Sequence, residues 1–231
     1  MTSLGVFDLG GRVAAVVGGT GVLGGAICHG LGEAGAAVAV DATQPATVEA
    51  ACREVEDRLG PVDILVNAPG VNSATPFFEI GIDEWHRLLD ANLTAVFVAC
   101  QVFGRAMVDH GHGGSIINIS SASSGPPLSR VLTYSVAKAG LNNLTQYLAR
   151  ELAPHRIRVN AIAPGFFPAE QNRTLLSEDR LRAIINHTPA ARLGEPRELV
   201  GTTVWLASEA ASGFVTGAIV RVDGGFSAMT I

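Results

Sequence analysis

The chain has 231 residues, of which 48% are hydrophobic and only 16% are charged, and its formal net charge is −5 at pH 7. This length suits one large α/β domain, and the apolar composition excludes a disordered chain and favours a sheet buried on both faces. The acidic balance gives no electrostatic reason to expect nucleic acid or an anionic membrane as a partner.

Strand-like and helix-like segments alternate along the chain. Short apolar runs predict strands at 12–17, 36–40, 62–66, 115–119, 157–162 and 218–222. Helices are expected at 24–35, 47–59, 82–110, 133–153 and 197–208, with a mobile helical segment at about 170–186. This alternation predicts an α/β fold with a doubly wound parallel sheet of the Rossmann type, in a single domain that spans residues 1–231.

The first predicted strand runs into a glycine-rich loop, Gly18-Gly19-Thr20-Gly21-Val22-Leu23-Gly24. Its glycines permit a tight turn, a close approach of the backbone to a pyrophosphate and close packing of the following helix on the strand. Asp41 ends the second predicted strand, at the spacing of an acid that binds the adenosine ribose. An ordinary strand-end turn residue is the alternative for Asp41.

Tyr134 and Lys138 are four residues apart near the start of a predicted helix, so they share one of its faces. An ammonium beside a phenol is expected to lower the tyrosine pKa towards neutrality, which suits a general acid/base. Lys138 is the only lysine among sixteen basic residues, which indicates a need for an ammonium rather than a guanidinium. A Tyr–Lys pair on a solvated helix face is the alternative.

A serine hydroxyl near this pair could hold a substrate oxygen. Ser121 lies thirteen residues before Tyr134 and directly follows a predicted strand. Its neighbours Ser120, Ser123 and Ser124 could serve equally well on position alone, so the residues by themselves do not decide between them.

Several motifs occur in one order along the chain: the glycine loop, Asn67-Ala68-Pro69-Gly70, Asn92-Leu93-Thr94, Ser121 with Tyr134-x-x-x-Lys138, Pro164-Gly165 and Val222-Asp223-Gly224-Gly225. Together they resemble the short-chain dehydrogenase/reductase family over essentially the whole chain. The resemblance implies a Ser121–Tyr134–Lys138 catalytic triad extended by Asn92. Tyr134 would exchange a proton with the substrate oxygen, and Lys138 would also bind the nicotinamide ribose.

The resemblance also implies roles for two asparagines. Asn92 would hold a helix distortion and a water of the proton relay, and Asn67 would steady the sheet beside the cofactor. The alternative for Asn92 is a helix-interior asparagine that bonds the backbone.

The implied cofactor is NAD or NADP, without a metal. Its expected contacts are Gly18, Thr20, Gly21, Leu23, Gly24, Asp41, Asn67, Ala68, Gly70, Tyr134, Lys138, Pro164, Gly165 and Phe167. NAD is expected to be preferred, because the Asp41 carboxylate would repel a 2′-phosphate and no arginine follows until Arg53.

The chain departs from the family pattern in three places. Val22 replaces the usual second glycine, and Ala169 replaces a threonine that commonly contacts the nicotinamide carboxamide. Between the glycine loop and residues 62–65, about one β–α unit of roughly 25 residues is missing. We therefore expect six strands instead of seven, with the strand that ends at Asp41 at the sheet edge. If this strand is instead the usual third one, Asp41 would lie beside the adenine.

Within the family, residues 161–167, 170–173, 187–189 and 223–226 are similar to mannonate (fructuronate) oxidoreductases, which act on sugar acids. Arg173 could bind a carboxylate, and Gln171 and Asn172 could meet hydroxyls, in a substrate lid around 166–192. An exposed helix whose polar residues face water is the alternative. Other interpretations of the chain are a 3-oxoacyl-thioester reductase and a catalytically silent scaffold.

The remaining expectations concern location and assembly. Residues 1–11 lack a basic stretch followed by an apolar core, no apolar run approaches about 18 residues, and the three cysteines show no metal-ligand or CxxC spacing. We expect a cytoplasmic protein without a membrane partner that acts on a small-molecule substrate. The apolar helix 133–153 and the C-terminal strand predict a homodimer or homotetramer.

Overall fold

The computed structural model describes residues 5–40, 45–126, 128–168 and 177–229. Its centre is a parallel sheet of six strands, which confirms the predicted fold class. The strands are β1 (Val13–Val17), β2 (Ala37–Val40), β3 (Ile64–Asn67), β4 (Gly114–Ile119), β5 (Ile157–Pro164) and β6 (Ile219–Val222). Their order is β2-β1-β3-β4-β5-β6, so β2 is the edge strand beside β1, as predicted.

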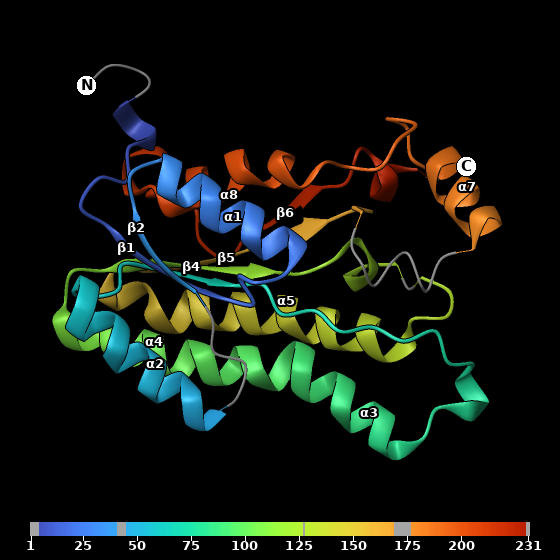
Figure 1. Cartoon of the computed structure of the whole chain (residues 1–231), viewed down its shortest axis with the longest axis horizontal. Coiled ribbons are helices and arrows are strands. Elements are labelled where there is room, and N and C mark those ends of the chain that lie inside the picture. Colours follow the sequence, from blue (N-terminus) through green and yellow to red (C-terminus); the bar gives the residue numbers. More distant parts are fainter. Residues whose placement is uncertain (1–4, 41–44, 127, 169–176, 230–231) are drawn as a thin grey trace.

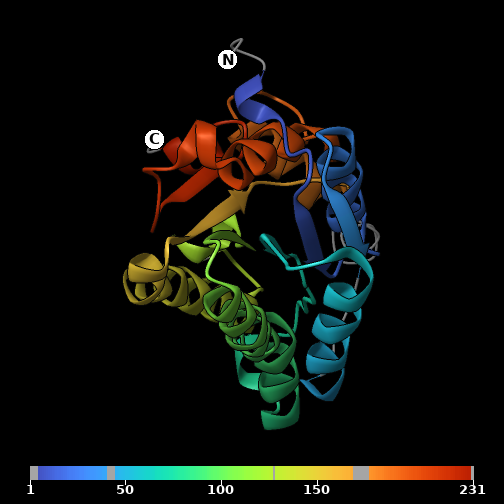
Figure 2. The ribbon, with the colours of Figure 1, turned by 90° about the vertical axis from the view of Figure 1, so that its left-hand side faces the viewer.

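Helices cover both faces of the sheet (Figure 1). One face carries α1 (Val22–Glu33), α8 (Val200–Ala207) and the short α9 (Glu209–Ser212). The opposite face carries α2 (Pro45–Leu59), α4 (Ala95–His110) and α5 (Leu132–Leu152), and Figure 2 shows the same layers from the side. Strand β1 serves both cores, because Val13, Ala15 and Val17 pack towards α2, α4 and α5 while Ala14 and Val16 pack towards α1 and α8.

The sheet has a topological switch between β1 and β3. After β1 the chain moves outward to β2, and after β2 it crosses back to β3 on the other side of β1. The chain therefore continues from β1 to α1 on one face of the sheet and from β3 to α4 on the other. Open α/β sheets bind ligands in the crevice at such a point, so the site should lie at the carboxyl ends of these strands.

The helix expected at 82–110 is continuous but not uniform. It comprises α3 (Ile82–Leu89), a π-helical segment at Asp90–Thr94 and α4. By length and apolarity its 29 residues would suffice to cross a membrane, with a mean hydropathy of 1.4 in the most apolar window, so the expectation that no segment approaches such a span was wrong. Its buried residues, among them Val96, Phe103 and Met107, pack in the protein interior, which is typical of a core helix.

Two other helices begin or end at residues that differ from the prediction. The helix expected at 197–208 is a 3-10 turn at Pro196–Leu199 followed by α8, and the chain then breaks at Ser208, whose side chain caps α9. The segment expected from 170 contains α7 (Glu178–His187), which begins after Ser177 because the Ser177 hydroxyl accepts a hydrogen bond from the Arg180 N–H. Asp41 and residues 169–173 lie outside the described residues.

Candidate active site

A cavity of about 220 Å³ opens at the carboxyl ends of the central strands. The predicted site residues that line it are Gly21, Leu23, Gly24, Ala68, Gly70, Ser121, Tyr134, Lys138, Pro164, Gly165 and Phe167. Gly18, Thr20, Asn67 and Asn92 do not line it; Thr20 is exposed, and the two asparagines are fully buried behind the cavity. The structure thus brings most of the predicted site together.

The glycine loop closely joins β1, α1 and the loop after β3. Gly18 has a φ of +78°, and a Cβ there would lie 2.9 Å from the Ala68 carbonyl carbon. A Cβ on Gly24 would lie 2.2 Å from the Gly18 oxygen, so both positions require glycine. A Cβ on Gly21 would meet nothing closer than 3.5 Å, which leaves room for a ligand there.

The start of α1 has the properties of an anion site. Gly21 is its N-cap and provides no side-chain hydrogen bond to the first turn. The first N–H groups of a helix have no partner inside the helix, and they lie at its positive end. A cradle of glycines leading to these groups fits the pyrophosphate of a dinucleotide.

Ser121 follows β4 and adjoins Tyr134, which lies in the first turn of α5. The Ser121 Oγ accepts hydrogen bonds from the N–H and hydroxyl of Ser123, at 3.1 and 3.0 Å. Burial raises the pKa of Tyr134, and a hydrogen bond with Ser121 partly opposes that shift. The expectation that Lys138 lowers this pKa towards neutrality was wrong for the protein without ligands, because removal of the phenol from water dominates.

The neighbouring serines have other partners. Ser120 Oγ donates to Asn142 Oδ1 at 2.6 Å, and Ser124 Oγ donates to the Ser121 carbonyl at 2.6 Å. Neither hydroxyl contacts Tyr134 in the described hydrogen bonds. The structure therefore favours Ser121 over these two neighbours, a distinction that position in the sequence could not make.

Lys138 is buried to 1% exposure and is turned towards backbone carbonyls. Its Nζ donates to the oxygens of Ile119 and Pro69, at 2.8 and 3.0 Å, and lies 5.6 Å from the centre of the Tyr134 ring. Burial lowers the pKa of Lys138 to about 7. An ammonium has three donors, so the two carbonyls leave one N–H for a ligand in the cavity.

Asn92 lies inside the π-helical segment and ties it to the loop after β3. Its Nδ2 donates to the carbonyls of Leu88 and Val71, both at 2.8 Å, and its Oδ1 accepts from the Val71 N–H at 3.1 Å. The predicted helix distortion is therefore present, and Asn92 bonds the backbone of the preceding helix and of the loop after β3. The same loop supplies the Pro69 carbonyl to Lys138.

Asn67, at the end of β3, belongs to a buried chain of polar groups. Its Nδ2 donates to Asn118 Oδ1 on β4, whose Nδ2 donates to Thr145 Oγ1 on α5, both at 2.9 Å. This chain links two central strands to α5, the helix that carries Tyr134 and Lys138. The arrangement agrees with the supporting role expected for Asn67.

Sequence reasoning missed several residues of the cavity wall. They include Asn72, Leu128, Arg130, Val131, Phe166 and Arg180. Among the described lining residues the charged ones are Lys138, Arg130 and Arg180, and none is an acid. The positive φ of Arg130, +68°, could not be read from the sequence. Arg173, the predicted carboxylate ligand, lies outside the described residues.

Known proteins with similar sequences and structures cover most of the chain. A short-chain dehydrogenase/reductase family model described as enoyl-(acyl carrier protein) reductase matches residues 24–227. A 2-dehydro-3-deoxy-D-gluconate 5-dehydrogenase from Formosa agariphila is 34% identical, covering 98% of this chain and 96% of that protein. The 3-oxoacyl-[acyl-carrier-protein] reductase FabG of Vibrio harveyi is 34% identical, covering 93% and 87%.

A solved structure agrees with these relatives. The gluconate 5-dehydrogenase from Burkholderia cenocepacia J2315, in complex with NADP and tartrate, superposes with a TM-score of 0.92 and 35% identity. The match covers 99% of this chain and 100% of that one. The chain therefore belongs to the short-chain dehydrogenase/reductase family and is an NAD(P)-dependent oxidoreductase.

Proposed function

We propose that this enzyme interconverts a ketone and a secondary alcohol on a sugar acid. The observation that carries the proposal is the charge of the cavity: three cationic side chains and no acidic one line it among the described residues, beside Tyr134 and Ser121. Such a wall favours an anionic substrate. The two relatives whose names give gluconate derivatives as substrates support this class. The sequence motifs that resemble mannonate (fructuronate) oxidoreductases extend the proposal to hexuronic acids.

The chemistry of the chain is acid–base catalysis at one substrate oxygen. A bound NAD(P)H would supply hydride to the carbonyl carbon. The Tyr134 hydroxyl would donate its proton to the carbonyl oxygen, while Ser121 donates a hydrogen bond to the same atom. Because burial raises the pKa of Tyr134, the phenol is protonated and ready to donate at neutral pH. The Lys138 ammonium would then stabilise the phenolate that remains.

The first test replaces Tyr134 with phenylalanine, which removes the transferable proton but keeps the ring. We expect turnover to be lost with little change in thermal stability. Activity within about threefold of the wild type, a barrier change under ~0.7 kcal/mol, would contradict the role of Tyr134. A panel of keto sugar acids, neutral ketoses and 3-oxoacyl thioesters, followed by NAD(P)H absorbance, tests the substrate class.

Reduction of a 3-oxoacyl thioester is a second candidate, favoured by the similarity to FabG of Vibrio harveyi. Turnover of the acyl thioester far above that of every acid in the panel would establish this candidate instead. Absence of NADH binding would favour the silent scaffold.

We also propose that one β–α unit is absent on the adenosine side. Alignment with the Formosa agariphila relative runs over 256 positions, although this chain has 231 residues, and β2 is the sheet edge. Asp41, by its spacing after the glycine loop, would bind the adenosine ribose and favour NAD over NADP. Titration of NADH and NADPH into the wild type and Asp41→Ser tests this. Tighter NADPH binding to the wild type, or an unchanged preference in Asp41→Ser, would reject it.

Three further expectations remain proposals. α7 supports a substrate lid around 166–192 within a single domain, because Arg180 on this helix lines the cavity.

The exposed side chains of Phe97 on α4 and Val136 on α5 support a homodimer or homotetramer. Light scattering that detects only monomers at micromolar concentration would reject the oligomer. We place the enzyme in the cytoplasm, which fractionation of the source cells can check.

A further inference from the structure

We propose that Arg180, aided by Arg130, binds the carboxylate of the substrate. This inference rests on the proposed function, and it assigns the anion recognition of the cavity to two named residues. It differs from the sequence-based expectation, which placed the carboxylate on Arg173. Both arginines line the same cavity as Tyr134, although 50 positions separate them in the chain.

Arg180 is held in place by the loop that precedes α5. Its Nη1 donates to the Ser129 hydroxyl at 2.9 Å, and its Nη2 donates to the Ser129 carbonyl at 2.7 Å. A guanidinium has five N–H donors in a planar fork, so these two bonds orient it and leave others for a ligand. The head group is therefore positioned before a substrate arrives, which reduces the entropy lost on binding.

The acidic residues nearest to Arg180 along its helix have another partner. Glu178 and Asp179 both pair with Arg182, at 3.6 and 2.6 Å. Among the described residues, no carboxylate forms an ion pair with Arg180 or with Arg130. A carboxylate entering the cavity would thus meet two guanidinium groups that pair with no acid in the described part of the chain, and bidentate guanidinium–carboxylate pairs are among the strongest polar contacts.

Arg130 stands directly between Ser129, the partner of Arg180, and the start of α5. Its left-handed φ of +68° is unusual for a residue with a side chain, and such conformations cluster at binding sites. Tyr134 lies four residues later, in the first turn of α5. Both arginines line the same cavity as this proton donor, so a sugar acid with its carbonyl at Tyr134 would bring its carboxylate into the cavity that they line.

The test compares Arg180→Gln with Arg182→Gln, a matched control on the same helix that does not line the cavity. We expect Arg180→Gln to raise the KM for 5-keto-D-gluconate and the inhibition constant of tartrate at least about tenfold. NADH affinity, melting temperature and kcat/KM for a neutral ketose should stay unchanged. Arg180→Lys should recover part of the loss, and the double variant with Arg130→Gln should lose more. Arg182→Gln, which frees Glu178 and Asp179 but leaves the cavity wall intact, should change these constants far less than Arg180→Gln.

Each outcome separates this inference from the proposed function. If the wild type reduces keto sugar acids but Arg180→Gln does so equally well, Arg180 is not the carboxylate ligand and the proposed function stands. If acid and neutral substrates suffer equally in Arg180→Gln, the residue supports the fold rather than recognition, and the inference is rejected. If the wild type turns over only neutral ketones or acyl thioesters, both proposals are overturned.

Discussion

Two cationic side chains are buried in the described part of the chain, at opposite ends of the sheet strands, and their surroundings differ. Lys138 lies at the carboxyl edge, where its Nζ contacts the carbonyl of Ile119, the last residue of β4. Arg158 lies near the amino end of β5, in register with Ser115 at the start of β4. Their exposed fractions are 1% and 6%. Burial lowers the pKa of both side chains.

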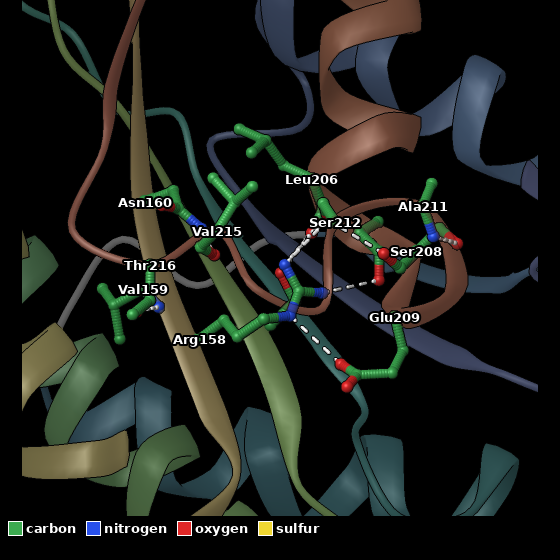
Figure 3. A network of polar contacts seen from close by, with 12 residues as sticks. Arg158, Val159, Asn160, Leu206, Ser208, Glu209, Ala211, Ser212, Val215 and Thr216 are labelled. Atoms are coloured by element: carbon green, nitrogen blue, oxygen red, sulfur yellow. Dashed lines mark hydrogen bonds and ion pairs between the residues drawn. The ribbon is translucent and has the colours of Figure 1, made fainter.

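Arg158 has its donors occupied by protein groups (Figure 3). Its Nη1 donates to the Leu206 carbonyl and the Ser212 hydroxyl, at 2.8 and 2.9 Å, and its Nε pairs with Glu209 at 3.1 Å. These partners lie at the end of α8 and on α9, so the guanidinium ties β5 to both helices and meets the negative end of α8. Arg158 does not line the cavity, and its role is structural.

Lys138 has no such set of partners. It contacts two neutral carbonyls, pairs with no acid in the described part of the chain, and faces the cavity. A buried charge without a counter-ion costs stability, so its presence indicates that a ligand or a reaction step needs it. Arg158 stabilises the fold, whereas the buried charge of Lys138 lowers its stability and serves the reaction.

The largest effect is expected for Lys138→Met, which keeps an unbranched side chain of similar size without charge and so tests the catalytic role of Lys138. We expect turnover to fall about 10³-fold or more, roughly 4 kcal/mol in barrier. Thermal stability should change little, because removal of the unpaired buried charge offsets the loss of its bonds to the Ile119 and Pro69 carbonyls. Lys138→Arg should also be inactive, because a planar fork does not replace a compact ammonium. Steady-state kinetics and a thermal melt measure both effects. Nearly normal turnover, or a marked fall in melting temperature, would contradict the assignment.

Arg158→Met should have the opposite effect. It removes the donor of the Ala207 carbonyl and one of the donors of the Leu206 carbonyl, which keeps Ser115, and it leaves Glu209 without its partner. We therefore expect the free energy of unfolding to fall by about 3 kcal/mol. The kcat of the folded fraction should stay within about twofold of the wild type. Urea unfolding combined with kinetics well below the midpoint measures this. A variant of normal stability would show that the network of Arg158 is dispensable.

The pH dependence of the free energy of unfolding gives a further test of the buried state of Lys138. Burial lowers the folded-state pKa of Lys138 to about 7, whereas an unfolded lysine has a pKa of about 10.4. Between these values the unfolded chain binds a proton that the folded chain lacks, so Lys138 makes the folded state more stable as pH rises. The stability difference between the wild type and Lys138→Met should change by up to about 1.4 kcal/mol from pH 7.5 to 8.5. A difference that is constant with pH would mean that Lys138 does not titrate there.

The smallest effect is expected for Glu209→Gln. Glu209 pairs with Arg158, but 67% of its side chain is exposed. Solvent screens such a pair, so we expect a loss of at most about 1 kcal/mol. Urea unfolding of Glu209→Gln and Arg158→Met in parallel compares the losses in free energy of unfolding of the two variants. A loss as large as that of Arg158→Met would place the stabilising effect in the ion pair rather than in the bonds to helix carbonyls.

Local patterns in the sequence predicted the layers of the protein and much of its site. Apolar strands and amphipathic helices depend on local periodicity, so the strands and helices of the sheet were predictable. The edge position of β2 was predicted only from the resemblance to the family and the unit missing from it. The glycine loop and the Tyr134–Lys138 spacing are likewise local patterns, because turn geometry and helical repeat act over a few residues. The π-helical segment around Asn92 was indicated only through the family resemblance.

Only the tertiary structure decided the electrostatics of the site. The raised pKa of Tyr134 and the lowered pKa of Lys138 follow from burial, which depends on what packs around each group and cannot be read from a four-residue spacing. The same holds for Arg180, which meets Ser129 across 51 positions, and for Arg158, which meets Glu209 at the same separation. Desolvation and long-range hydrogen bonds arise when distant segments close on one another, so they exist only in the folded chain.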